Sequence, residues 1–225
     1  MATKYDAIII GTGQAGPSLA VRLAEAGMKV AIIERKRFGG TCVNNGCIAT
    51  KTLVASARAA HVARRADDYG VAIPGSIAVD MKKVKARKDA VVRQSSEGLQ
   101  KWLRNTPNLA VIEGQARFAD AHRVQVGDEL LEADKVFINV GGRASVPPLR
   151  GIDQVRYLNN STMMDVDFLP EHLVVIGGSY VGLEFAQMYR RFGSEVTVVE
   201  RGPRLIHRED DDITENIKTI LEAKA

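Results

Sequence analysis

The sequence has only two cysteines, Cys42 and Cys47, and both lie in one stretch, GGTCVNNGCIATK (residues 39–51). Two cysteines in a chain of 225 residues exclude a scaffold held together by disulfides. A close pair in a reducing compartment is more often catalytic or metal-binding. The pair could therefore be a redox couple, half of a metal site, or two buried inert thiols.

The sequence also lacks a long hydrophobic run. No apolar stretch approaches the roughly 20 residues that span a bilayer. The apolar stretch from Ala7 to Ile10 is short and is followed at once by glycine. The N-terminus leads directly into it, without the longer apolar region and cleavage site of a signal peptide. We therefore expect a globular, cytoplasmic protein with no membrane partner, long enough for one large domain or two small ones.

Charge of one sign is only slightly in excess, at a net +4. Much of the excess lies in one segment that also carries apolar residues at helical spacing, which indicates an amphipathic helix. No interleaved aromatic residues or recognition motif accompany it, so we favour a solvated helix face over a nucleic-acid surface. The basic residues of this segment are Lys82, Lys83, Lys85, Arg87, Lys88 and Arg93.

An internal repeat is the strongest pattern in the chain. Residues 10–35, IGTGQAGPSLAVRLAEAGMKVAIIER, align without a gap with residues 176–201, IGGSYVGLEFAQMYRRFGSEVTVVER, and eight of the 26 positions are identical. Each copy reads as a buried strand, a glycine turn, a helix and a second strand that ends in an acid. The sequence therefore predicts an α/β protein with two βαβ units.

The first copy carries the pattern of a dinucleotide site. Gly11 permits a tight turn, Gly13 lets the backbone approach a pyrophosphate, and Gly16 allows close packing of helix and strand. The diphosphate then lies at the positive end of the helix. Glu34, at the end of the second strand, can accept hydrogen bonds from a ribose. The alternative is a βαβ unit with a purely structural role.

The second copy departs from this pattern at its middle position. Gly177 and Gly182 are present, but Ser179 stands where the first copy has a glycine. A small residue still allows close approach, and Glu200 favours an unphosphorylated ribose, hence NAD. Arg201 and Arg204 nearby leave NADP open. Two dinucleotide sites on one chain indicate electron transfer between two cofactors, one of them a flavin.

The position of the cysteines favours redox chemistry. The four histidines are scattered without ligand spacing, which argues against zinc. Cys47 precedes an alanine-rich segment, residues 49–65, that we expect to be helical, and a helix N-terminus lowers the pKa of a thiol. Lys51, four residues later on the same face, adds a cation. Two buried inert thiols remain the alternative.

Four stretches together resemble the pyridine nucleotide-disulfide oxidoreductases, over essentially the whole chain. They are GTGQAG, GGTCVNNGCIATK, VFINVGGRASVPPLRGI (residues 136–152) and GGSYVGLEFA. The chain is most similar to the branch that holds mercuric reductase and dihydrolipoamide dehydrogenase. The resemblance implies a Rossmann-like FAD-binding domain of three-layer ββα character, followed by the start of a second Rossmann-like domain that binds NAD or NADP.

The resemblance also implies roles for single residues. Cys47 would be the thiolate that faces the flavin, and Cys42 the interchange thiol that attacks the substrate. Lys51 would lie by the flavin N5, paired with Glu184, whereas the residues alone favour two solvated charges. The FAD-contacting positions would be Gly11, Gly13, Ala15, Gly16, Glu34, Arg35, Gly40, Thr41, Lys51, Gly114, Ala116, Gly141 and Gly142. Those for the nicotinamide dinucleotide would be Gly177, Ser179, Gly182 and Glu200.

Two departures from the family matter. Ala49 stands where proline usually follows the second cysteine, which we expect to loosen the start of the helix without removing a reacting group. The chain ends at Ala225, before the remainder of the dinucleotide domain and the dimerisation domain. If these residues are the whole polypeptide, we expect little turnover and an exposed apolar edge on the second domain.

The expected organisation follows from these positions. Residues 1–150 form the first segment of the FAD domain with the redox disulfide, 151–171 a linker and returning strand, and 172–225 the truncated NAD(P) domain. We expect a flavoenzyme that passes electrons from NAD(P)H through FAD to the Cys42–Cys47 disulfide. Its acceptor would be a small molecule, a disulfide or a mercuric ion, and its longer form would be a homodimer. The alternative is a fragment that keeps nucleotide-binding folds without catalysis.

Overall fold

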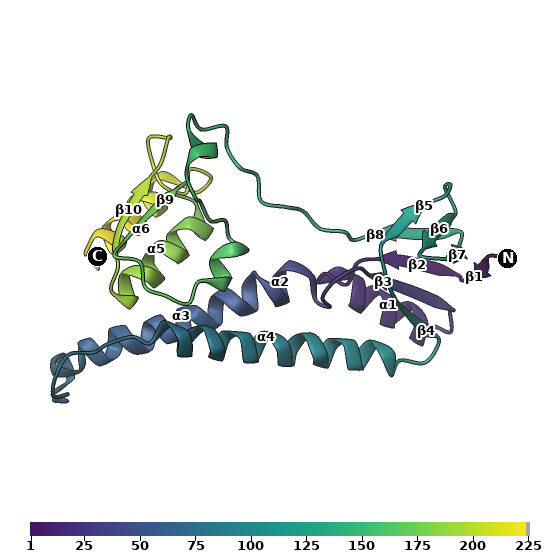
Figure 1. Cartoon of the computed structure of the whole chain (residues 1–225), viewed down its shortest axis with the longest axis horizontal. Helices are drawn as coiled ribbons and strands as arrows, with labels where there is room; N and C mark the ends of the chain where they lie inside the picture. Colours follow the sequence, from purple (N-terminus) through teal and green to yellow (C-terminus); the bar gives the residue numbers. More distant parts are fainter. Residues whose placement is uncertain (224–225) are drawn as a thin grey trace. The chain divides into compact units, whose positions relative to one another are not determined.

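The computed structural model describes residues 1–223, which fall into two compact units (Figure 1). Unit 1 comprises residues 1–49 and 89–161, and unit 2 comprises residues 50–88 and those from 162 onward. Two long helices, α3 (Cys47–Arg64) and α4 (Met81–Arg104), have residues in both. The predicted domain boundaries at residues 150 and 172 stay a prediction. Residues 224 and 225, the last two of the predicted second domain, lie outside the described part.

The centre of unit 1 is a parallel sheet in the order β4-β3-β2-β8. The two middle strands are buried on both faces and consist of aliphatic residues, as is usual where a parallel sheet is covered on both sides. Helix α1 connects β2 to β3 and completes the first predicted βαβ unit. The bounds are β2 Ala7–Ile10, α1 Ala15–Glu25, β3 Val30–Glu34, β4 Leu109–Glu113 and β8 Lys135–Ile138.

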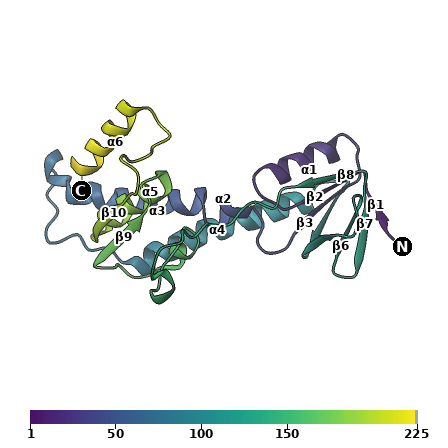
Figure 2. The ribbon, with the colours of Figure 1, turned by 90° about the horizontal axis from the view of Figure 1, so that it is seen from above.

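Alternation along β2 and β3 assigns their side chains to two cores. Ile9 and Ile32 pack with α1 and with Leu103 of α4 on one face. Ile8 and Ile33 pack on the other face against a second sheet. Figure 2 shows α1 on one side of the parallel sheet and β6 and β7 on the other. Each fully buried aliphatic side chain contributes roughly 1.5–3 kcal/mol, so both layers hold the sheet in place.

The second sheet of unit 1 has the order β1-β7-β6-β5 and supplies the third layer of the predicted ββα arrangement. Its strands β5, β6 and β7 are antiparallel, whereas β1 pairs with β7 in parallel. Strands β1, β5 and β7 carry no alternation long enough to predict them from the sequence. The bounds are β1 Thr3–Lys4, β5 Ala116–Phe118, β6 Arg123–Val126 and β7 Glu129–Glu132, with a short 3₁₀ turn at Ile152–Gln154.

Unit 2 contains the second βαβ repeat. Strands β9 (His172–Ile176) and β10 (Glu195–Val199) pair in parallel, and α5 (Tyr180–Phe192) joins them. Tyr189 of α5 is 1 % exposed, and burial raises the pKa of its hydroxyl to about 12. The unit also has α6 (Asp211–Ala223) and two 3₁₀ turns, Ala66–Tyr69 and Thr162–Asp165.

The two strands of unit 2 leave apolar residues at the surface. Val174, Ile176 and Val199 are 54 %, 57 % and 49 % exposed. That this surface is the apolar edge expected for the second domain stays a prediction. Among residues 1–223, no helix combines the length and the apolar character needed to cross a membrane.

Candidate functional site

The two predicted glycine turns have the same backbone geometry. Gly11 and Gly177 adopt φ values of +107° and +109°, which side chains rarely tolerate. Each donates its amide to the strand that ends in the predicted acid, Gly11 to Ile33 and Gly177 to Val199, at 2.8 Å in both cases. The internal repeat of the sequence is therefore a repeat of hydrogen bonds as well.

The third glycine of each turn is required by a close approach. A Cβ atom on Gly16 would lie 2.3 Å from the carbonyl oxygen of Gly11, and one on Gly182 would lie 2.3 Å from that of Gly177. Both contacts are far shorter than real carbon–oxygen contacts and involve backbone atoms. Helices α1 and α5 therefore begin directly against their turns, as the sequence predicts.

The helix ends behind both turns are free of acid and of side-chain caps. Gln14 and Ser179, the residues that precede α1 and α5, make no side-chain cap bond to their helices, and neither first turn contains Asp or Glu. Ala15 is the first residue of α1, and Ser179 precedes α5 in extended conformation. The Gly16 amide of α1 already donates to the carbonyl oxygen of Gly13 at 3.0 Å, and Pro17 has no N–H. The positive end of a helix still attracts a phosphate, so both turns fit a dinucleotide diphosphate.

Each repeat ends in a glutamate that is held by backbone amides. Oε2 of Glu34 accepts from the amide of Thr12 at 3.1 Å, and Oε1 accepts from the amides of Arg35 and Lys36 at 2.9 Å. In the second repeat, Glu200 accepts from Gly178 at 2.6 Å and Gly202 at 2.8 Å.

These amide bonds affect the charge of the second glutamate. The N–H groups of Gly202 and Gly178 hold the pKa of Glu200 below its ordinary value of 4.5. Both carboxylates are thus fixed at the carboxyl ends of their strands, where a ribose would lie.

Of the predicted positions Gly114 and Ala116, Gly114 lies beside Glu34, whereas Ala116 is the first residue of β5 and pairs with Val126. The amide of Gly114 donates to the carbonyl oxygen of Glu34 at 2.8 Å, and Arg35 donates to Oε1 of Gln115 at 3.1 Å. Gly114 and Gln115 line an open cavity of about 610 Å³ between β4, β5 and the β6–β7 turn. The cavity therefore adjoins Gly114, whose amide is bonded to the end of the strand that carries Glu34.

Asn139 is a site residue that the sequence analysis missed. Its backbone amide donates to Ile10 at 2.8 Å, and its side-chain amide donates to the carbonyl oxygens of Gly11 and Gly13 at 3.3 Å. It thereby fixes the turn from the end of β8, and places the exposed Gly141 and Gly142 two and three residues beyond it. Only its place after a buried strand marks it in the sequence.

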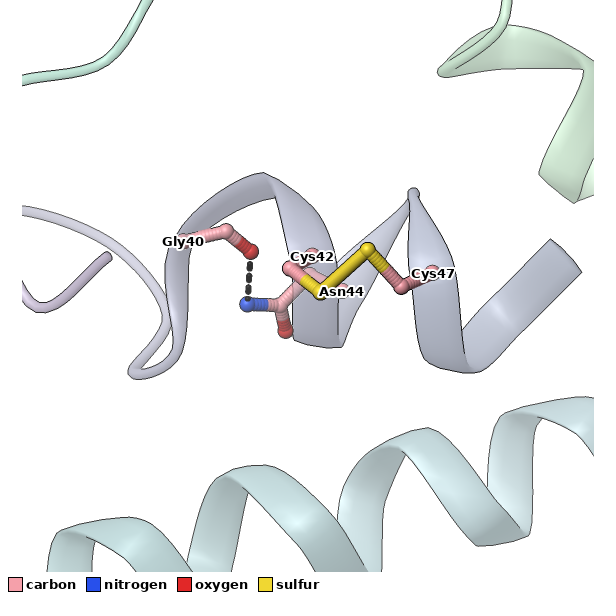
Figure 3. The surroundings of a disulfide bond; sticks show 4 residues. All are labelled: Gly40, Cys42, Asn44 and Cys47. Carbon is pink, nitrogen blue, oxygen red and sulfur yellow. Dashed lines mark hydrogen bonds between the residues drawn. A yellow bond between two sulfur atoms is a disulfide. The ribbon is translucent and has the colours of Figure 1, made fainter. Parts of the chain in front are cut away.

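The two cysteines form a disulfide, with Cα atoms 4.6 Å apart (Figure 3). Cys42 lies in the short helix α2 (Gly40–Asn44) and is partly buried, whereas Cys47 is the exposed first residue of α3. The predicted position of Cys47 at a helix N-terminus is therefore confirmed. Ala49 is fully buried in α3, which begins two residues before it, and the expected loosening of the helix start stays a prediction.

The turn before Cys42 rests on the first glycine turn. A Cβ on Gly40 would lie 2.8 Å from the Cα of Gly13, so the two segments touch through their glycines. The side chain of Asn44 donates to the carbonyl oxygens of Phe38 and Gly40 at 2.9 Å and binds the turn to α2. Thr41 lies exposed in the same helix. The turn that leads to Cys42 and the candidate diphosphate turn are thus in direct backbone contact.

Lys51 and Glu184 form an ion pair within unit 2, between α3 and α5. The side chains are 63 % and 33 % exposed, so water screens the pair and its contribution to stability is small. From the two residues alone we expected Lys51 and Glu184 to be separate solvated charges, which is wrong. The ion pair that the family resemblance implies is present. Among the described residues, no three His, Cys, Asp or Glu side chains come together as metal ligands.

Comparison with known proteins agrees with this geometry. Residues 5–224 match the family described as pyridine nucleotide-disulphide oxidoreductase. The "Probable pyridine nucleotide-disulfide oxidoreductase RclA" of Escherichia coli (strain K12) is 42 % identical over 97 % of this chain and 47 % of its own length. A mercuric reductase of Lysinibacillus sphaericus is 34 % identical over 97 % of this chain and 40 % of its own length.

A solved structure has the same fold. It is titled "Cu(II) complex of HOCl-induced flavoprotein disulfide reductase RclA from Escherichia coli", with a TM-score of 0.85 and 39 % identity. The match covers 99 % of this chain and 48 % of that one, so the chain spans about half the length of the relatives it matches. The repeated dinucleotide turns, the disulfide and the family match together show that this chain belongs to the pyridine nucleotide-disulfide oxidoreductase family.

Proposed function

We propose that the chain carries the FAD site and redox disulfide of a flavin-dependent oxidoreductase. Electrons pass from a nicotinamide dinucleotide through FAD to the Cys42–Cys47 disulfide and on to an acceptor. The family binds FAD and NAD(P)H. The observation that carries the proposal for this chain is the contact of Gly40 with Gly13, which brings the disulfide segment onto the candidate diphosphate turn.

The residues of unit 1 that would hold FAD each have a physical reason. The uncapped N-terminus of α1 receives the diphosphate, and Glu34 accepts hydrogen bonds from the adenosine ribose. The cavity at Gly114 and Gln115 receives the adenine. Bound FAD supplies a carrier that accepts two electrons from a dihydronicotinamide and passes them on.

The disulfide is the next electron carrier. Its reduction consumes two electrons and two protons and breaks the bond between Cys42 and Cys47, leaving two thiols. Cys47 at the N-terminus of α3 is the better stabilised thiolate, because the helix dipole lowers the pKa of a thiol. Cys42 is then the thiol that attacks the acceptor, and closing the disulfide again releases the two electrons to it.

Lys51 supplies a positive charge four residues after Cys47, and Glu184 holds its ammonium group. An ammonium near the redox pair stabilises the anionic forms of thiol and reduced flavin. We propose this role for the ion pair.

The acceptor is proposed as a small molecule, either a disulfide or a thiophilic metal ion, and the working form as a cytoplasmic homodimer. The disulfide fits both acceptors, because a thiolate attacks a disulfide sulfur and also binds soft metals. Two relatives support this choice of acceptors. One is named mercuric reductase, and the other is a flavoprotein disulfide reductase solved as a Cu(II) complex.

FAD binding by the purified chain tests the proposal. We expect the protein to stay yellow through gel filtration after incubation with FAD. Glu34→Ala should raise the FAD dissociation constant at least about tenfold, because a charged hydrogen-bond acceptor is lost. Glu25→Ala, which removes an exposed acid at the end of α1, is the matched control and should bind as the wild type does. A wild-type protein that emerges colourless would refute FAD use by this chain and favour a fold without catalysis.

The second repeat is proposed to prefer NADH over NADPH because Glu200 repels a 2′-phosphate. Replacing Glu200 by glutamine should raise the NADH dissociation constant about tenfold and leave NADPH binding equal or tighter. Because its folded pKa lies below 4.5, the carboxylate stays charged as pH falls from about 8 to 5, and its contribution is lost only below that range. Fluorescence titration with both nucleotides across this range is the measurement, and equal affinities in the wild type would contradict the assignment.

A further inference from the structure

Thr12 occupies the second position of the first glycine turn. Its side chain links Glu34, at the end of β3, to Gly39, in the turn that leads to Cys42. It is 1 % exposed. Its hydroxyl donates to Oε2 of Glu34 at 2.6 Å and accepts the amide hydrogen of Gly39 at 3.1 Å. A buried hydroxyl with both a donor and an acceptor bond satisfied is held in one orientation.

Each end of this bridge leads to a part of the candidate site. Glu34 is the carboxylate proposed for the adenosine ribose. Gly39 begins the turn into α2, which carries Cys42 three residues later. Asn44 and the Gly40–Gly13 contact tie that turn to α2 and to the glycine turn. A displacement of Gly39 therefore moves the segment that presents Cys42.

The second repeat shows that the fold does not need this hydroxyl. The equivalent residue is Gly178, whose amide bonds to Glu200 just as the Thr12 amide bonds to Glu34. Gly177 keeps the same backbone angle as Gly11 without a side chain beside it. The second copy has no room for a side chain here, because a Cβ atom on Gly178 would lie 2.5 Å from the Leu205 side chain. The first copy has both the room and a hydroxyl, and it is the copy that is followed by the redox cysteines.

We propose that Thr12 is a positioning residue that fixes the turn carrying Cys42 relative to the carboxylate of Glu34. FAD binding and the disulfide–dithiol equilibrium are then coupled through its hydroxyl. This inference rests on the proposed function, since it takes Glu34 as the ribose ligand. Without the hydroxyl, the Gly39 amide is buried with no acceptor and Glu34 loses its shortest hydrogen bond.

Two variants separate the hydroxyl from the shape of the side chain. Thr12→Val keeps the branched shape and removes the hydroxyl, whereas Thr12→Ser keeps the hydroxyl. Thr106→Val is the matched control, because the Thr106 hydroxyl donates locally, to the carbonyl oxygen of Trp102 near the end of α4. Circular dichroism and urea unfolding establish that each variant is folded before it is used.

The first measurement uses the protein without flavin. The disulfide is equilibrated with reduced and oxidised glutathione, in which two glutathione thiols reduce the protein disulfide and yield one glutathione disulfide. Alkylation and mass analysis give the dithiol fraction. We expect Thr12→Val to shift the equilibrium constant roughly threefold to tenfold, and Thr12→Ser and Thr106→Val to stay within about twofold of the wild type.

The second measurement is the FAD dissociation constant of the same proteins. Thr12→Val should raise it roughly tenfold, and Thr12→Ser should restore it. The inference is overturned if Thr12→Val changes only the urea midpoint, or if serine fails to rescue either quantity. A wild type that binds no FAD refutes the proposed function instead, and the glutathione equilibrium still decides whether Thr12 positions the turn.

Discussion

Replacing Cys47 by serine is expected to abolish the long-wavelength absorption band between thiolate and flavin and to lower acceptor reduction at least about a thousandfold. The band needs a thiolate next to the flavin, and Cys47 is the exposed cysteine at the N-terminus of α3. Serine has nearly the same size, but its hydroxyl does not ionise near neutral pH. The measurement is the visible spectrum of FAD-loaded protein before and after addition of dithiothreitol.

Replacing Cys42 by serine is the matched variant and should behave differently. It also prevents the disulfide, so acceptor reduction falls by a similar factor. Cys47 is then a free thiol under all conditions, and the long-wavelength band appears without any reductant. If Cys47→Ser keeps the band, or Cys42→Ser loses it, the assignment of the two sulfurs is reversed or the disulfide does not face the flavin.

The repeat made a large part of this fold predictable from sequence. A glycine turn between a buried strand and a helix requires small residues at fixed spacing, and both copies supply them within 26 residues, the second with Ser179 at the middle position. Local sequence also marks the helix that begins at Cys47, since its alanine-rich composition favours helix. Such features depend on neighbours in the chain, which the sequence shows directly.

The contacts that complete the site join residues far apart in the chain. Asn139 reaches Gly11 across 128 residues, and Lys51 reaches Glu184 across 133. The ion pair was predicted only through the family resemblance, because nothing local to either residue marks a partner. Thr12 was overlooked for the same reason: its bonds to Glu34 and Gly39 exist only once β2, β3 and the cysteine turn are packed. Strand β5 has three residues, too few for alternation to be read.

Replacing Gly16 by alanine is expected to raise the FAD dissociation constant more than about a hundredfold and to destabilise the protein by about 2–4 kcal/mol. The new methyl group would lie 2.3 Å from the Gly11 carbonyl oxygen and 2.7 Å from the Asn139 side chain. The oxygen belongs to a turn whose amide is bonded to β3, so it cannot move alone. The start of α1 must instead shift away from the turn, which moves the positive end of the helix away from the diphosphate.

Two further alanine variants decide whether this loss is specific. Gly182→Ala creates the same 2.3 Å overlap in the second repeat, so it should weaken NADH binding and leave FAD binding in unit 1 intact. Gly98→Ala, in the interior of α4, meets no described atom within 4 Å beyond its neighbours and the local helix backbone, and should stabilise the helix by about 0.5–1 kcal/mol. FAD and NADH titrations together with urea unfolding separate the three cases. Each of the first two variants should lose a different nucleotide, because each steric overlap is confined to one repeat. If Gly16→Ala and Gly182→Ala reduce both affinities equally, the two turns are not separate dinucleotide sites.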